Sequence, residues 1–171
     1  MLHRFIIFCG IFFNFAFAEI FEPFNKEMLH YLEQMPWHLY ELHTVPKLGH
    51  FWIDEIDERE KETLREGKIW KSYLIDRMKK YIKKGDRVVD VGAGVGTFSL
   101  AMGRMVGLEG RVFAFEGTKQ KFRELYYTAH ANPEIPISPL FYDLKNVSKN
   151  LRESPGKHLE NSLVFLEDPN H

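Results

Sequence analysis

Two acidic residues and three alternating glycines form the pattern in this sequence that is most typical of a ligand site. Asp90 stands two residues before the first glycine of "DVGAGVG", in which Gly92, Gly94 and Gly96 alternate. Glycine lets the backbone pass close to a ligand where a Cβ would collide, and it tolerates positive φ. Glu116 ends the next apolar run, "RVFAFE", at the distance of the ribose-binding acid in nucleotide-binding units. This pattern predicts a site for an adenosine-containing ligand.

A regular alternation of strands and helices surrounds these residues. The apolar run 87–91 predicts a strand buried on both faces of a parallel sheet, and 97–106 predicts a helix ended by Gly107. Residues 111–115 predict a second strand, and 119–131 a second helix. This alternation predicts an α/β fold with a Rossmann-like, doubly wound parallel sheet, whose ligands sit beyond the carboxyl ends of the strands.

Two further strands are expected after the second helix. Residues 140–142 predict a third strand, which Pro136 and Pro139 restrict to a sheet edge or a late start. The segment "SLVFLE", with 163–166 at its centre, predicts a fourth strand close to the end of the sequence.

Dinucleotides and other adenosine ligands use such loops differently. The dinucleotide fingerprint G-x-G-x-x-G/A needs a small third residue, and counted from Gly92 that position is Thr97. A carboxylate at Asp90 is also awkward beside a pyrophosphate but useful beside a cationic amino-acid ligand. A nicotinamide-dependent oxidoreductase is therefore disfavoured.

The stretch "VVDVGAGVGTFSLAMGRMVGLEGRVFAFEG" resembles the nucleotide-binding half of class I S-adenosylmethionine-dependent methyltransferases. Within that class it looks most like the FkbM-type group, which characteristically reads D-V-G-A-x-x-G and then V-x-A-F-E-P. The resemblance covers about residues 80–132, and Gly117 departs from it where the family usually has proline. It implies S-adenosyl-L-methionine as cofactor and O-methylation of a small-molecule or glycan acceptor.

The resemblance also implies which residues hold the cofactor. The implied cofactor-binding residues are Asp90, Gly92, Ala93, Gly94, Gly96, Glu116 and Asp143. Those around the loop would shape the space for the methionine portion, and Glu116 would hold the ribose. Asp143 would correspond to an acid that contacts adenine in many relatives, although "FYDL" matches poorly. Neither a catalytic base nor a metal site is predicted.

The resemblance implies a sheet of seven strands in the order 3-2-1-4-5-7-6, which is more than the four strands predicted here. If 163–166 forms the fourth strand, the chain is a truncated, N-terminal half of that fold. The alternative to an active methyltransferase is a non-catalytic remnant that binds the cofactor weakly or acts as an interaction domain. An exposed strand edge would favour a partner chain or a dimer that covers it.

Composition predicts one ordinary globular domain, since 171 residues carry a net charge of −1 and 44% are hydrophobic. Near-neutral charge predicts that the protein binds no nucleic acid. Residues 1–18 combine a basic start with an apolar run and the ending Ala16-Phe17-Ala18, which predicts a signal peptide or another hydrophobic N-terminal segment. Secretion or membrane association would follow, with a cytoplasmic location as the alternative.

The predicted organisation has three parts: the segment 1–18, an N-terminal extension 19–67, mainly helical, and a partial methyltransferase domain 68–171. Up to residue 50 the extension reads as aromatic-rich and irregular, punctuated by prolines. The stretch "IDEREKETLREG" predicts a solvated helix face closed by Gly67. Residues 69–84 predict an amphipathic helix terminated by Gly85.

Overall fold

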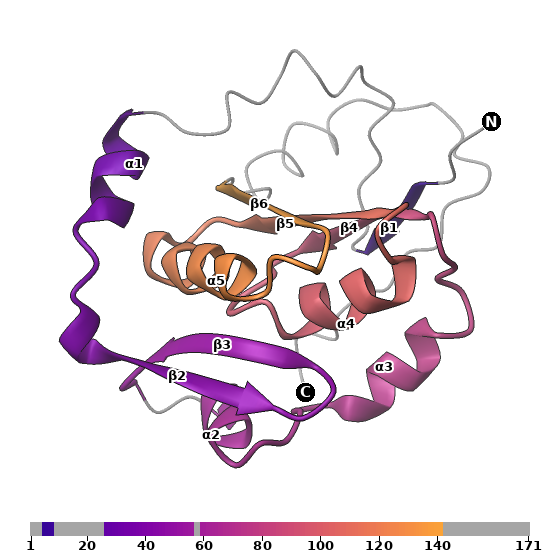
Figure 1. The fold of residues 1–171 in the computed structure, drawn as a ribbon, viewed down its shortest axis with the longest axis horizontal. Coiled ribbons are helices and arrows are strands. Elements are labelled where there is room, and N and C mark those ends of the chain that lie inside the picture. The colour runs from indigo at the N-terminus through magenta and orange to yellow at the C-terminus, as the bar shows by residue number, and fades with distance from the viewer. Residues whose placement is uncertain (1–4, 9–25, 57–58, 142–171) are drawn as a thin grey trace, which may run out of the picture.

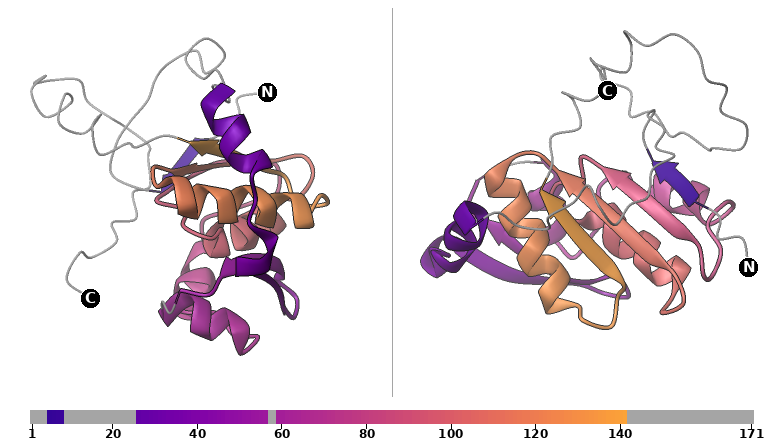
Figure 2. Two further views of the ribbon diagram at one scale, coloured as in Figure 1. Left: turned by 90° about the vertical axis from the view of Figure 1, so that its left-hand side faces the viewer. Right: turned by 90° about the horizontal axis from the view of Figure 1, so that it is seen from above.

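A parallel four-stranded sheet forms the centre of the protein, in a computed structural model that describes residues 5–8, 26–56 and 59–141. The strands are β1 (Phe5–Phe8), β4 (Arg87–Val91), β5 (Arg111–Glu116) and β6 (Ile137–Phe141). Their order across the sheet is β1-β4-β5-β6, and each neighbouring pair is parallel. Seen from above in Figure 2, the four strands lie side by side with β1 and β6 at the two edges.

Two helices cover one face of this sheet (Figure 1). They are α4 (Thr97–Val106), which follows β4, and α5 (Lys119–Ala131), which follows β5. Consecutive parallel strands joined by right-handed crossovers place both helices on the same face. Leu100 and Met102 of α4 and Phe122 and Leu125 of α5 are fully buried there. The predicted α/β fold with a Rossmann-like parallel sheet is confirmed, and the predicted helix bounds 97–106 and 119–131 match.

The N-terminal part of the described chain forms a third layer. Strands β2 (Tyr40–Val45) and β3 (Gly49–Asp54) make an antiparallel hairpin on the side of α4 and α5 opposite to the sheet (Figure 1). The 3₁₀ helix η1 (Trp37–Leu39) and α2 (Arg59–Arg65) contact this hairpin, whereas α1 (Lys26–Glu33) packs against α5 and α3 (Ser72–Met78) contacts α4. The hairpin contradicts the prediction that residues up to 50 are irregular, whereas α1, η1 and α2 are helices in the extension predicted to be mainly helical.

Strand β3 is docked on α5 by a ladder of hydrogen bonds from its backbone to helix side chains. The three bonds are Asp54 N–H to Glu124 Oε1 (2.9 Å), Trp52 N–H to Thr128 Oγ1 (3.1 Å) and His50 N–H to Asn132 Oδ1 (2.9 Å). Every fourth residue of a helix advances about 6.0 Å along its axis. Every second residue of a strand advances about 6.6 Å. The two repeats match closely enough for helix side chains to replace a neighbouring strand.

The first strand corrects the interpretation of the N-terminus. Phe5–Phe8 lies inside the predicted signal segment 1–18, yet its backbone pairs in register with Arg87–Asp90 of β4. A segment that completes the central sheet belongs to the folded protein, so the signal-peptide prediction is wrong. The predicted secretion or membrane association through this segment is wrong with it. Among the described residues, every helix is too short or too polar to cross a bilayer.

Two predicted helices also differ from those observed. Helix α2 is not a solvated face, because Lys61 is 1% exposed and Leu64 is fully buried. Gly67 does close it, with φ of 70° and an N–H bonded to Leu64 O. The helix predicted over 69–84 is confined to α3, which begins after Lys71 in a left-handed conformation. The predicted fourth strand at 163–166 lies outside the described residues.

Candidate nucleotide site at the glycine loop

The glycine loop connects the carboxyl end of β4 to the first turn of α4. Gly92, Gly94 and Gly96 have φ values of 76°, 55° and 95°, so all three occupy the left-handed region. This conformation strains residues that carry a Cβ, which explains why glycine alternates through the loop. Because the loop follows the carboxyl end of a parallel strand, it lies where ligands bind in open α/β sheets.

Backbone amides of this loop donate to groups of the protein itself. Gly92 N–H and Ala93 N–H both donate to Phe115 O, at 2.9 and 3.0 Å, and Gly96 N–H donates to Ala93 O at 2.9 Å. Gly94 N–H donates to Glu116 Oε2 at 3.0 Å. A pyrophosphate-binding loop works by directing such amides at the anion. Here these four amides are already engaged, which disfavours a dinucleotide.

The glycines differ in what surrounds them. Among the described residues, a Cβ on Gly92 would meet nothing within 4 Å, and one on Gly94 would meet only Glu60 Oε2 at 3.7 Å. A Cβ on Gly96 would lie 3.0 Å from Leu125 Cδ1 and 3.5 Å from Thr128 Cγ2. Gly92 thus borders open space that a ligand could fill, Gly94 has the Glu60 carboxylate within van der Waals range, and Gly96 permits α4 and α5 to pack together.

Glu116 lies beside the loop, as its position at the end of β5 predicts. It is 7% exposed, and its other oxygen, Oε1, accepts a hydrogen bond from Thr118 N–H at 2.8 Å. These backbone bonds hold the carboxylate in one orientation. Because each carboxylate oxygen can accept more than one hydrogen bond, Glu116 retains the capacity to accept from ribose hydroxyls.

The other predicted site residues occupy different surroundings. Asp90 is buried at the end of β4, and its Oδ2 accepts from Ser99 Oγ of α4 at 2.5 Å. Ala93 packs its side chain into the core with Met28 and Phe122. Asp143 lies outside the described residues, so its predicted contact with adenine stays a prediction.

Glu60 is a residue near this loop that the sequence analysis missed. It lies on α2, and its Oε1 accepts a hydrogen bond from Thr97 Oγ1 at 2.6 Å. Thr97 is the first residue of α4 and is 1% exposed. Glu60 belongs to a run of alternating charges that is typical of a solvated helix, so no local signal distinguishes it. Its 37-residue separation from Thr97 conceals the contact.

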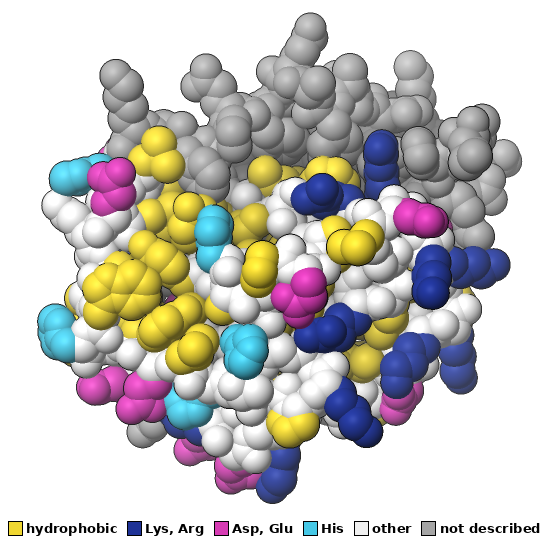
Figure 3. Space-filling view, viewed as in Figure 1, with side chains coloured by type: hydrophobic (Ala, Val, Ile, Leu, Met, Phe, Trp, Pro, Cys, Tyr) yellow, Lys and Arg dark blue, Asp and Glu magenta, His cyan; other side chains and the backbone are white. Residues whose placement is uncertain are grey.

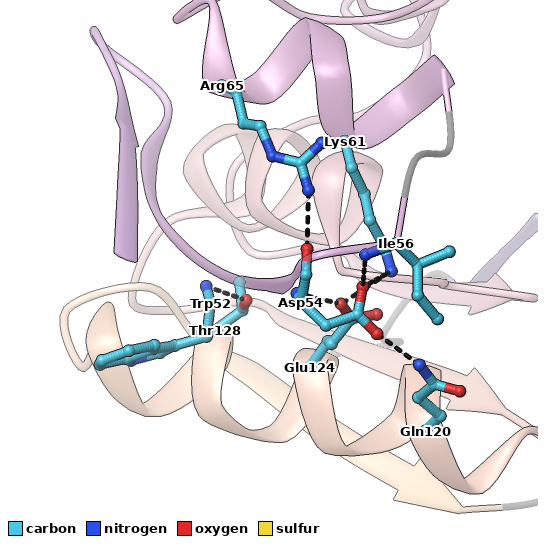
Figure 4. Close-up of polar contacts among 8 residues, drawn as sticks. All are labelled: Trp52, Asp54, Ile56, Lys61, Arg65, Gln120, Glu124 and Thr128. Carbon is cyan, nitrogen blue, oxygen red and sulfur yellow. Dashed lines mark hydrogen bonds and ion pairs between the residues drawn. The ribbon is translucent and has the colours of Figure 1, made fainter. Parts of the chain in front are cut away.

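The residue after Glu60 anchors α2 in a buried ion cluster (Figure 4). Lys61 Nζ lies 2.5 Å from Asp54 Oδ1 and 3.0 Å from Glu124 Oε1. Gln120 donates to Asp54 Oδ2, and Arg65 donates to Asp54 O at 2.7 Å. The cluster joins β3, α2 and α5 at the end of the hydrogen-bond ladder formed by Asp54 and Glu124.

Burial and charge act in opposite directions in this cluster. Burial raises the pKa of the Glu124 carboxyl to about 7, against the stabilising effects of the Asp54 N–H and the Lys61 ammonium. Burial would also raise the pKa of Asp54, but hydrogen bonds from Lys61 and Gln120 outweigh it and lower that pKa. Among the described residues, Glu124 Oε2 has no hydrogen-bond partner. The charged form of Glu124 is therefore the costly one.

The strand order and the loop at the carboxyl end of β4 define a Rossmann-like α/β protein. No protein-family model matches the chain, and no curated protein sequence does. Solved structures that are similar include a SAM dependent methyltransferase from Aquifex aeolicus, with 22% identity, a TM-score of 0.39 and 43% of each chain covered. The chain thus spans less than half of that protein's length.

Two further solved structures share more of the chain. The tRNA methyltransferase of M. jannaschii has 20% identity and a TM-score of 0.45, covering 63% of this chain and 31% of its own. Aeropyrum pernix fibrillarin, in complex with natively bound S-adenosyl-L-methionine, has 17% identity and a TM-score of 0.41, covering 75% of this chain and 66% of its own.

These similarities correct the predicted exclusion of nucleic acid. The M. jannaschii protein is named as a tRNA methyltransferase, and the prediction that a near-neutral net charge excludes nucleic acid is wrong. The physical reason is that net charge averages over the surface. Lys and Arg side chains gather on the side of the molecule where α3 lies (Figure 3), and Lys79, Lys80, Lys83 and Lys84 are exposed there. The exclusion from net charge is withdrawn.

Proposed function

We propose that the glycine loop binds S-adenosyl-L-methionine and that the protein is a methyltransferase. The observation that carries this proposal is the pairing of open space at Gly92 with carboxylates beside Gly94. Glu116 can hold the ribose, and the engaged amides of the loop suit a ligand without phosphates. A ligand that is cationic at its amino-acid end matches acidic surroundings, whereas a pyrophosphate does not.

When bound, this cofactor supplies an electrophilic methyl group on a sulfonium. The residues of the chain would contribute binding and orientation: Glu116 at the ribose and the loop backbone at the methionine portion. Methyl transfer is an in-line displacement, so positioning of the acceptor can supply much of the catalysis. A general base is needed only where the acceptor must lose a proton.

The finer assignment, FkbM-type methylation of an oxygen atom, is part of the same proposal. Its support is the pair of motifs "DVGAGVG" and "VFAFEG" in the sequence. Methylation assays that offer hydroxyl-bearing and nucleic-acid acceptors side by side would test it. Transfer to oxygen of a small molecule or glycan is the expected result, and failure to methylate any such acceptor would overturn the FkbM assignment while leaving the methyltransferase in place.

Calorimetry on the full chain tests cofactor binding directly. We expect binding of S-adenosylmethionine and of S-adenosylhomocysteine, and none of NADH. Glu116→Gln should weaken both about ten- to a hundredfold, because hydrogen bonds to a charged acceptor contribute about 1.5–3 kcal/mol. The matched control is Glu109→Gln, an exposed residue in the turn before β5. NADH binding by a folded chain that ignores S-adenosylmethionine at millimolar concentration would overturn the proposal.

A further inference from the structure

Helix α2 brings a carboxylate from the N-terminal part of the chain to the glycine loop. Glu60 Oε1 accepts from Thr97 Oγ1 at 2.6 Å, and Glu60 Oε2 lies 3.7 Å from the point where a Cβ of Gly94 would be. The Glu60 carboxylate therefore lies on the side of Gly94 where another residue would carry a side chain, two residues from the open space at Gly92. No resemblance or motif assigns this residue to the site.

The position of Glu60 is set by the side chain next to it in sequence. Lys61 is 1% exposed and holds α2 against β3 and α5 through Asp54 and Glu124 (Figure 4). Arg65, one turn further along α2, adds a bond to Asp54 O. Because Lys61 fixes the rotation of α2, its neighbour Glu60 points in a direction that the fold determines.

Gly94 thus has a carboxylate on two sides. Its N–H donates to Glu116 Oε2 at 3.0 Å, and Glu60 Oε2 faces its Cα. Two carboxylates around one glycine disfavour an anionic group and favour a cation in the space between. In S-adenosylmethionine the cations are the sulfonium and the α-ammonium. The sulfonium methyl must face the acceptor, whereas an ammonium offers three N–H donors to carboxylates.

We propose that Glu60 is a cofactor-binding residue whose carboxylate binds the α-ammonium of the methionine portion. This inference rests on the proposed function. It makes α2 a part of the methyl-donor site that lies outside the region of family resemblance, and it gives Lys61 a role as a positioning residue. The ribose and the methionine portion would then be held by acids from two different elements, Glu116 at the end of β5 and Glu60 on α2.

The test compares Glu60→Gln with the wild-type chain for three ligands by calorimetry. These are S-adenosylmethionine, S-adenosylhomocysteine and 5′-methylthioadenosine, which lacks the amino-acid portion. Glutamine keeps an oxygen that can accept from Thr97 and removes only the charge. We expect Glu60→Gln to lose about ten- to a hundredfold in affinity for the first two ligands equally. Affinity for 5′-methylthioadenosine should stay within about twofold.

Two further variants separate binding from folding. Glu62→Gln removes an exposed charge from the same helix and should leave all three affinities unchanged. Glu60→Asp keeps the charge and should retain more affinity for S-adenosylmethionine than Glu60→Gln does. Thermal unfolding of each variant shows whether α2 remains docked.

Each outcome bears on one proposal or the other. Glu60→Gln within twofold of wild type for S-adenosylmethionine, or an equal loss for 5′-methylthioadenosine, would overturn the role of Glu60 while the proposed function stands. A selective loss for S-adenosylmethionine over S-adenosylhomocysteine would move Glu60 to the sulfonium and overturn the assignment to the ammonium. A folded wild-type chain that binds none of the three would overturn both.

Discussion

Two polar regions of the molecule differ in sequence separation and in access to solvent. One is the glycine loop; the other is the joint between β3 and α5, which consists of the hydrogen-bond ladder and the ion cluster around Lys61. The loop links residues close in sequence, with the Gly94–Glu116 bond spanning 22 positions, and it borders open space. The joint links residues 70 to 82 positions apart and is closed to solvent at Glu124, Thr128 and Asn132. A loop that keeps space open can serve a ligand, whereas a buried joint can serve only the fold.

Substitutions in the two regions should affect different properties, stability in the joint and cofactor affinity in the loop. Changes in the joint should lower the free energy of unfolding, because they leave buried polar groups without partners. Changes at the open glycines should lower cofactor affinity with a smaller effect on stability.

Replacing Lys61 should break the joint most severely. Lys61→Met leaves the buried carboxylates of Asp54 and Glu124 without their cation, which typically costs about 3–5 kcal/mol. Urea unfolding followed by circular dichroism measures the change. The control is Lys68→Met, whose ion pair with Glu66 is exposed and should contribute less than about 1 kcal/mol. Equal stabilities of the two variants would contradict a buried anchor.

The joint should also make stability depend on pH through Glu124. Burial raises the pKa of this carboxyl from its ordinary value of 4.5 to about 7 in the folded protein, so folding favours the protonated form. Stability from this group is present below about pH 4.5 and is lost as pH rises through 7, by up to about 3 kcal/mol.

Glu124→Gln cannot ionise and tests this dependence. Subtracting its unfolding free energies from those of the wild type, between pH 5 and 8, isolates the contribution of Glu124 from those of the histidines. The wild type should lose stability relative to the variant across that range. A difference that stays constant with pH would show that Glu124 does not change its ionisation there.

Removing the Asn132 side chain should destabilise the end of the hydrogen-bond ladder at His50. Its amide bonds both the N–H and the carbonyl of His50, at 2.9 and 2.7 Å, in the manner of a neighbouring strand. Asn132→Ala leaves these groups unpaired and should cost about 2 kcal/mol in thermal or urea unfolding. Glu134→Gln, at an exposed position two residues on, serves as the control. An unchanged unfolding midpoint for Asn132→Ala would mean that water replaces the amide.

Within the loop, two glycines should respond differently to the same substitution. Gly92→Ala and Gly96→Ala both place a Cβ at positive φ, which costs about 1–2 kcal/mol. At Gly96 the Cβ also meets Leu125 Cδ1 at 3.0 Å, so its loss of stability should be the larger. At Gly92 the Cβ enters open space, so the main effect should be weaker binding of S-adenosylmethionine. Paired unfolding and calorimetry measurements would refute the distinction if both variants lost stability and affinity in the same proportion.

The part of the fold around the loop could be predicted because its signals are local. Strand β4 matches the predicted range 87–91, and α4 and α5 match theirs, since apolar periodicity, glycine and proline act within a few residues. The acid at Glu116 could be placed for the same reason, as the residue that ends a strand.

Residues of the joint could not be predicted, because each looks like a surface residue. Glu124, Thr128 and Asn132 lie on a face of α5 that reads as solvent-exposed, and Lys61 lies in a run of charges. Polar residues are buried only where they find hydrogen-bond partners. Here the partners belong to a hairpin that was not predicted, because prolines and aromatic residues made its sequence look irregular. The segment 5–8 was misread for a related reason, since an apolar run has the same composition in a signal as in a strand.

The ends of the strands and the turn beside the ligand space could be predicted from the sequence alone, because those properties depend on neighbouring residues. The burial of particular charges and the approach of Glu60 to the glycine loop are visible only in the folded protein. Those outcomes depend on the meeting of segments far apart in the chain, where the energy of a polar group is set by the partner it finds.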